Sequence, residues 1–132
     1  MTATVYQPLK TSAPISYNVT SQTIQELLLA IGFPQHVYGY NYVMYSLELI
    51  LENPEILHHI TKELYPQIAK HFDSTPARVE RAIRTAIHIT WLYGNLPMIN
   101  TIFGNTIRSD KGVPTNTQLL AGLYFFIKHK NP

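Results

Sequence analysis

Residues 62–91, KELYPQIAKHFDSTPARVERAIRTAIHITW, decide the fold of this 132-residue chain. Their pattern predicts two helices, at about 62–72 and 76–92, separated by a polar turn at 73–75. Pro76 suits the first position of the second helix, where proline costs no hydrogen bond. Two short helices joined by a tight turn are typical of a helix-turn-helix, which presents its second helix to DNA.

The second helix has the clearest periodicity in the sequence. At about 100° per residue its side chains divide into a polar arc and an apolar arc. The polar arc holds Ala77, Arg78, Glu80, Arg81, Arg84, Thr85 and His88. The opposite arc holds Val79, Ala82, Ile83, Ala86, Ile87, Ile89 and Thr90. The small side chains at 82 and 86 would let another helix approach closely. Thr75 or Ser74 is a suitable N-cap and Gly94 a suitable stop.

The first helix of the pair is less regular. Leu64, Ile68 and Phe72 recur every four residues, which indicates one buried face. Pro66 lacks a backbone donor and cannot lie in a regular helix interior. Either the regular helix begins near Tyr65 with Pro66 in its first turn, or the helix is kinked at Pro66.

The rest of the chain is also predicted to be helical. Helical periodicity or helix signals mark residues 23–31, 34–51, 96–103 and 116–129, with a turn of helix at 55–60. No stretch alternates as a strand would, so we expect an all-α fold of about six helices. Residues 1–22 are rich in Thr, Ser and Pro and are predicted to be a flexible arm or linker before a helical domain at 23–132. Residues 105–113 are expected to form an exposed loop.

An aromatic stripe runs along the segment 34–51. Its members are Val37, Tyr40, Met44, Leu47 and Leu51, widened by Tyr38, Tyr42, Tyr45 and Leu49. A stripe of this kind is more typical of a core than of a ligand-binding face.

Composition excludes several classes of protein. The chain has no cysteine, which excludes disulfides, thiolate metal ligands and cysteine nucleophiles. Its longest apolar run, residues 119–127, is shorter than the roughly 20 residues that span a bilayer. No signal peptide is visible, so we expect a cytoplasmic protein, nucleoid-associated when it binds DNA, without a membrane partner.

The sequence offers no pattern for metal, cofactor or catalytic chemistry. Its six histidines include the adjacent pair His58 and His59, but none has the spacing of a metal-ligand pair on a helix. There is no phosphate-binding glycine loop, no nucleophile elbow and no usefully spaced pair of carboxylates. The chain is therefore not expected to be an enzyme or to hold a metal or cofactor.

Charge is unevenly distributed along the chain. Residues 1–60 have one basic and four acidic side chains, a sum of −3, whereas residues 61–132 have nine basic and four acidic ones, a sum of +5. A basic half beside an acidic half indicates a polyanionic partner such as double-stranded DNA. The alternative is chance scatter in a small sample.

The arginines of the second helix suit contact with DNA bases. The planar guanidinium group can donate two hydrogen bonds to O6 and N7 of guanine, and residues near the start of a recognition helix reach base edges. Arg78 and Arg81 are therefore the predicted base readers. Glu80 could accept from the amino group of cytosine or hold Arg84, four residues later, in an ion pair. Predicted supporting or phosphate contacts are Lys70, Ala77, Arg84, Thr85 and His88. The alternative is that these arginines only solvate an exposed helix face.

Several blocks also carry a family resemblance. They are IGFPQHVYGYNY (31–42), ITKELYPQIAKHF (60–72), ARVERAIRTAI (77–87), GN (94–95), IFG (102–104) and PTN (114–116). The chain resembles the C-terminal DNA-binding effector domain of the sporulation-initiation master response regulator. The resemblance implies a six-helix domain whose helix at 76–92 reads a TGTCGAA-like element through positions 77, 78, 80 and 81. The family usually has serine at the position of Ala77 and commonly alanine at Pro76.

The resemblance also implies partners. Family members bind DNA as tandem copies and contact the RNA polymerase sigma subunit through the region of residues 92–107, in which Leu96, Ile99 and Phe103 are the candidate contacts. Pro97, Met98 and Asn105 depart from the family pattern there. Because only about 22 residues precede the match, we expect no counterpart of the family's receiver domain. The remaining alternative is a chain that has lost or altered DNA binding. It would act as a protein-interaction module, through the tyrosine-rich segment 35–51, or as an antagonist of a full-length regulator.

Overall fold

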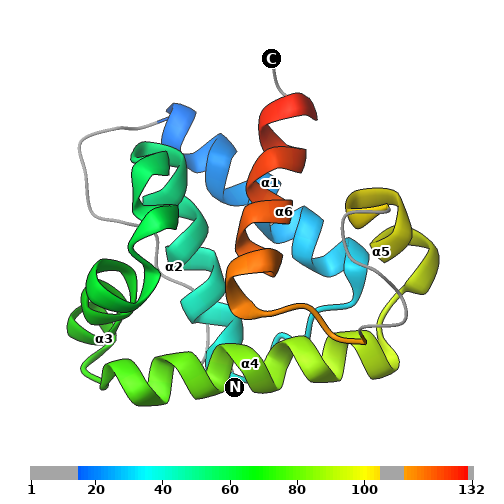
Figure 1. Ribbon diagram of the computed structural model, residues 1–132. Coiled ribbons are helices and arrows are strands. Elements are labelled where there is room, and N and C mark those ends of the chain that lie inside the picture. The colour runs from blue at the N-terminus through cyan, green and yellow to red at the C-terminus, as the bar shows by residue number, and fades with distance from the viewer. Residues whose placement is uncertain (1–14, 105–111, 131–132) are drawn as a thin grey trace.

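The computed structural model describes residues 15–104 and 112–130 of the chain (Figure 1). Six α-helices and two short helical turns account for most of this part, which contains no strand. In chain order they are α1 (Ile15–Ile31), α2 (Tyr38–Glu52), η1 (Pro54–His58), η2 (Ile60–Leu64), α3 (Tyr65–Phe72), α4 (Pro76–Tyr93), α5 (Leu96–Phe103) and α6 (Asn116–Lys130). The all-α prediction is confirmed, and the predicted loop at 105–113 lies largely outside the described residues.

Two predicted boundaries are wrong. Helix α1 begins at Ile15, so residues 15–22 are helical rather than part of an irregular arm. Helix α2 begins at Tyr38 and not at Pro34, because Val37 is extended, with φ −116° and ψ 155°. Phe33 is buried, and its N–H donates to the carbonyl of Leu28 at 2.9 Å. The residues directly after α1 therefore pack and hydrogen-bond against the end of that helix, and α2 begins only after them.

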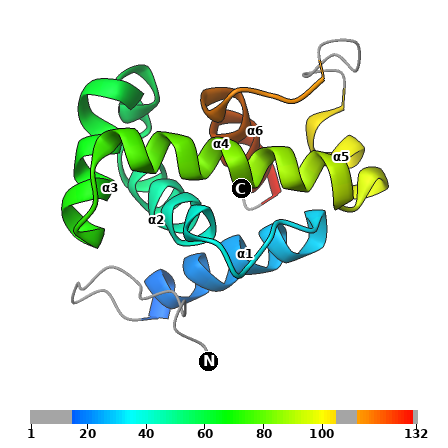
Figure 2. The ribbon, with the colours of Figure 1, turned by 90° about the horizontal axis from the view of Figure 1, so that it is seen from below.

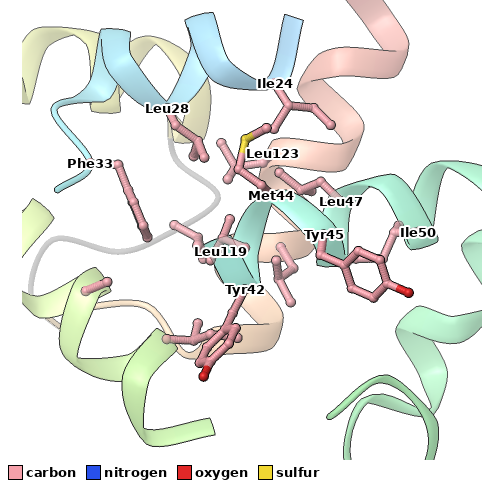
Figure 3. Close-up of a cluster of buried hydrophobic side chains, with 14 of the residues drawn as sticks. Ile24, Leu28, Phe33, Tyr42, Met44, Tyr45, Leu47, Ile50, Leu119 and Leu123 are labelled. Carbon is pink, nitrogen blue, oxygen red and sulfur yellow. The ribbon is translucent and has the colours of Figure 1, made fainter. Parts of the chain in front are cut away.

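Helix α2 is the centre of the core. Every residue from 39 to 48 is buried, because α2 packs against α1, α4 and α6 on different sides. Figure 3 shows Met44 and Leu47 of α2 between Ile24 and Leu28 of α1 and the leucines of α6. Most of the aromatic stripe is thus core, as predicted. This burial leaves few side chains of the segment 35–51 exposed to a protein partner, mainly at its start.

Tyr38 is the exception in this stripe. Its side chain is 70% exposed, so the prediction that it belongs to the core is wrong. Tyr38 is the first residue of α2, which packs against α4.

Helices α2 and α4 cross at a contact between small residues. A Cβ added to Gly39 would lie 2.6 Å from the carbonyl oxygen of Ala82 and 2.8 Å from the Cβ of Ala86. The two alanines therefore allow the close approach that the sequence predicted. This contact places α4 across one end of α2, with α3 at one side (Figure 1).

Helix α3 contains Pro66 in its first turn. The preceding turn η2 is a single wide π-type turn, in which the N–H groups of Glu63 and Leu64 both donate to the carbonyl of His59. The first of the two alternatives for Pro66 is confirmed: the regular helix begins at Tyr65. The α3 helix, the turn at 73–75 and α4 have the order and lengths of a helix-turn-helix.

Helix α6 begins with a reciprocal cap. The N–H of Gln118 donates to Oγ1 of Thr115 at 3.1 Å, and the N–H of Thr115 donates to the side chain of Gln118 at 2.9 Å. This capping box fixes the start of α6 and therefore the position of Asn116, its first residue.

Candidate nucleic-acid interface

The outer face of α4 is a continuous exposed surface of the molecule. Seen from below, α4 crosses in front of the other helices (Figure 2). The predicted division into two arcs is confirmed. Val79, Ile83, Ala86, Ile87 and Thr90 are buried. The exposed residues of the polar arc are Ala77, Arg78, Arg81, Arg84, Thr85 and His88, with Glu80 partly exposed.

The turn before α4 sets where this face begins. Helix α3 ends at Phe72 and is capped by Asp73, which has left-handed dihedral angles of φ 56° and ψ 53°. The N–H of Ser74 donates back to the carbonyl of Ala69 at 2.8 Å. Thr75 then caps α4, since its Oγ1 accepts from the N–H of Arg78 at 3.2 Å. The predicted cap is confirmed, and Arg78 therefore lies in the first turn of α4.

A groove of about 520 Å³ opens beside this end of α4. One wall is the start of α2, the other is α4, and the turn between α3 and α4 closes one end. The residues around it are Val37, Tyr38, Gly39, Tyr42, Phe72, Asp73, Ser74, Arg78, Arg81, Ala82 and Thr85. Both predicted base-reading arginines thus line the groove. Neither makes an ion pair with another residue of the described part of the chain.

Glu80 lies at the other edge of the polar arc. Two residues along a helix are separated by about 200°, so Glu80 and Arg78 point in nearly opposite directions around α4. Glu80 Oε2 accepts from Nη1 of Arg84 at 2.6 Å, as the spacing predicted, with both side chains partly exposed. The three predicted base readers are therefore spread over the whole arc, with Arg81 near its middle.

A buried hydrogen-bond network holds the Glu80 edge of α4. The side-chain nitrogen of Asn116 donates to the carbonyl of Glu80 and to the hydroxyl of Tyr65, both at 3.0 Å. Burial raises the pKa of Tyr65 above its ordinary value of 10.0, so the phenol stays neutral. A single amide thus joins α3, α4 and α6 and fixes the two helices of the pair relative to each other.

The two predicted phosphate contacts lie on either side of this region. Lys70 is exposed on α3, and His88 is exposed on α4, one turn after Arg84. Neither makes an ion pair with the rest of the described chain. Both side chains are therefore accessible from solvent.

Two of the three predicted sigma contacts are buried. Ile99 and Phe103 of α5 are each only 3% exposed, and the ring of Phe103 packs against Trp91 with 5.4 Å between centroids. They belong to the core and cannot contact another protein. Leu96 is 58% exposed, and it shares this end of the molecule with Leu92 and Tyr93, which are 73% and 82% exposed.

Sequence reasoning missed two residues that stand near the candidate interface. It also did not single out Leu92 within the predicted sigma region, although the helical projection of α4, continued by one turn, places this residue on the outer arc. Asp73 and Tyr38 border the groove only because the start of α2 and the turn at 73–75 meet beside α4. No pattern within a short stretch of sequence reveals that these two segments lie close together in the fold.

Comparison with known families agrees with this geometry. The family model described as “Sporulation initiation factor Spo0A C terminal” matches residues 24–126. The chain belongs to this family. The Spo0A C-terminal family is a sporulation-related DNA-binding domain of transcription regulation, which confirms the resemblance inferred from the sequence blocks. The match covers α2 to α5 completely, most of α6 and the second half of α1. Within the described residues, no helix is both long and apolar enough to cross a bilayer.

Proposed function

We propose that α4 is the recognition helix and that it enters the major groove of a TGTCGAA-like element. The single observation that carries this proposal is the outer face of α4, on which Arg78 and Arg81 are exposed in the first two turns and form no ion pair with any other described residue. An unpaired arginine fork is free to bind guanine at O6 and N7. A merely solvated helix face would not require arginine rather than lysine.

The arc suggests a role for each side chain. Arg81, near the middle of the arc, is assigned to a base in the centre of the contacted element, and Arg78 to a base nearer the start of α4. Glu80 either accepts from a cytosine amino group or keeps Arg84 in place for a phosphate, since the two already form an ion pair. Thr85, His88 and Lys70 are assigned to the DNA backbone. Ala77 lacks the hydroxyl usual in the family, so the base preference at its contact should differ.

Alanine substitutions test the arginine assignments. Arg78→Ala and Arg81→Ala should each weaken binding to the TGTCGAA duplex by about 1–3 kcal/mol, measured by fluorescence anisotropy. Each should also reduce the steepness of log affinity against log salt by about 1. The reason is that each variant has one cation fewer to displace a counterion from the DNA. Lys128→Ala is the matched control, since Lys128 is an exposed cation near the end of α6. Figure 1 shows that this end of α6 points away from α4. Wild-type affinity in both arginine variants would contradict the assigned roles.

We also propose that two copies bind tandem elements. A duplex with two correctly spaced copies should bind each protein molecule more tightly than a duplex with one copy. Equal affinity per site would remove this part of the proposal.

Contact with the polymerase sigma subunit is proposed at the exposed apolar patch of Leu92, Tyr93 and Leu96 rather than at Ile99 and Phe103, which are buried. Leu92→Ser combined with Leu96→Ser should abolish capture of sigma by the DNA-bound protein while leaving DNA affinity unchanged. Undiminished capture would contradict this surface.

A further inference from the structure

An exposed tyrosine stands at the rim of the groove beside α4. Tyr38 is 70% exposed, although the ten residues that follow it in α2 are all buried. It lies on the wall opposite Arg78 and Arg81. Packing within the protein does not account for the exposure of this large aromatic side chain.

The ring of Tyr38 is held in place by its neighbours. It stacks on Tyr42, one turn later in α2, with 6.4 Å between centroids and 18° between planes. Tyr42 is buried and meets Phe72 of α3 edge to face at 5.3 Å. Tyr42 and Phe72 thus make the structural contacts of this wall, whereas Tyr38 is supported on one face and open on the other. Its hydroxyl makes no hydrogen bond within the described part of the chain.

The groove suits an anionic ligand that lies alongside α4. Its charged residues are two arginines and one aspartate, Asp73, so the lining has a net positive charge. The sugar-phosphate backbone borders the major groove on both sides, and a recognition helix inside that groove brings its flanking elements against the phosphates. A tyrosine hydroxyl is one of the groups that donate to phosphate oxygens in such contacts.

We propose that Tyr38 is a DNA-backbone contact, whose hydroxyl donates to a phosphate oxygen of the strand that follows the groove between α2 and α4. The inference rests on the proposed function of α4 and extends the interface to a helix outside the helix-turn-helix pair. Because phosphates carry no base identity, Tyr38 contributes affinity for any sequence. It positions α4 and does not choose its bases.

The conservative variant Tyr38→Phe isolates the hydroxyl, because it keeps the ring and its stack on Tyr42. It should weaken binding by about 3- to 10-fold, and by the same factor on the TGTCGAA duplex and on a scrambled duplex. The salt slope should stay unchanged, since the variant removes no cation. Tyr93→Phe is the matched control: Tyr93 is 82% exposed but lies at the other end of α4, and its variant should bind like wild type. Urea unfolding of both variants should match wild type.

Neutral phosphate substitution gives the direct test. A set of duplexes is prepared, each with a single methylphosphonate at a different position. The wild-type protein should bind more weakly to those duplexes in which the substituted phosphate is one that it contacts. At one phosphate bordering the element, the loss of affinity caused by the methylphosphonate should be smaller in Tyr38→Phe than in the wild-type protein, because both changes remove the same contact. In Tyr93→Phe, each methylphosphonate should cost as much affinity as in the wild-type protein. Additive effects at every phosphate, or wild-type affinity of Tyr38→Phe while Arg81→Ala is impaired, would overturn the Tyr38 contact alone. Absence of DNA binding by the wild-type chain would overturn the proposed function together with it.

Discussion

Asp73 is the residue whose position is least favourable for DNA binding. It holds the left-handed conformation that ends α3, and among the described residues it is the one non-glycine with positive φ. Aspartate tolerates this conformation better than most residues, because its short polar side chain can bond locally. It also lines the groove that Arg78 lines, and it brings a negative charge there.

We therefore expect Asp73→Asn to bind DNA more tightly. Asparagine keeps the tolerance for left-handed backbone and removes a negative charge from the surface that approaches phosphates. The gain should be about 2- to 5-fold at low ionic strength and should shrink as salt shortens the Debye length. Stability should be unchanged or higher by up to about 1 kcal/mol, since a carboxylate at the C-terminal end of α3 opposes the helix dipole.

Anisotropy titration at two salt concentrations measures this effect. Glu55→Gln is the matched control, because it removes an exposed negative charge from η1, at the other end of α2. Equal affinity of Asp73→Asn and wild type would show that DNA does not pass this end of the groove.

At the scale of elements, the crossing of α2 and α4 depends on Gly39. Gly39→Ala would place a methyl group 2.6 Å from a backbone oxygen of α4, and the two helices would have to separate. We expect a loss of about 1–3 kcal/mol in the free energy of unfolding, despite the better helix propensity of alanine.

Urea denaturation of Gly39→Ala provides the measurement. Ala77→Ser adds one atom at an exposed position of α4 and should leave stability within about 0.5 kcal/mol of wild type. Unchanged stability of Gly39→Ala would mean that the crossing is not as close as described.

Most elements could be predicted from local sequence signals. The cap at Thr75, the stop at Gly94 and the place of Pro66 in a first turn act within a few residues, and each was confirmed. The start of α2 could not be predicted, because the chain after Gly32 is extended to bury Phe33 against α1. That cause is a tertiary contact and leaves no periodic pattern.

The same difference explains which site residues were predicted. Arg78 and Arg81 follow from the two arcs of one helix, which periodicity reveals. In α5 nearly every residue is apolar, so sequence alone could not say that Ile99 and Phe103 face inward while Leu96 faces out. Tyr38 looked like one more core tyrosine, since its exposure depends on where α2 begins relative to α4.

At the scale of the whole molecule, the fold presents one helix outward and uses the others to hold it. α2 is buried along most of its length, α6 fixes α3 and α4 through Asn116, and α4 crosses the outside of the assembly (Figure 2). This arrangement gives a rigid support for the helix that we propose enters the major groove. It also leaves most of the polar arc of α4 exposed along its length.

The central claim is that this surface reads a DNA sequence, and titration of the wild-type chain on two duplexes tests it most directly. One duplex contains TGTCGAA, and the other contains the same bases in scrambled order, both at about 0.15 M salt. Sequence reading by α4 predicts binding at least about 100-fold tighter on the TGTCGAA duplex. Equal affinity for the two duplexes, or no binding to either, would contradict it.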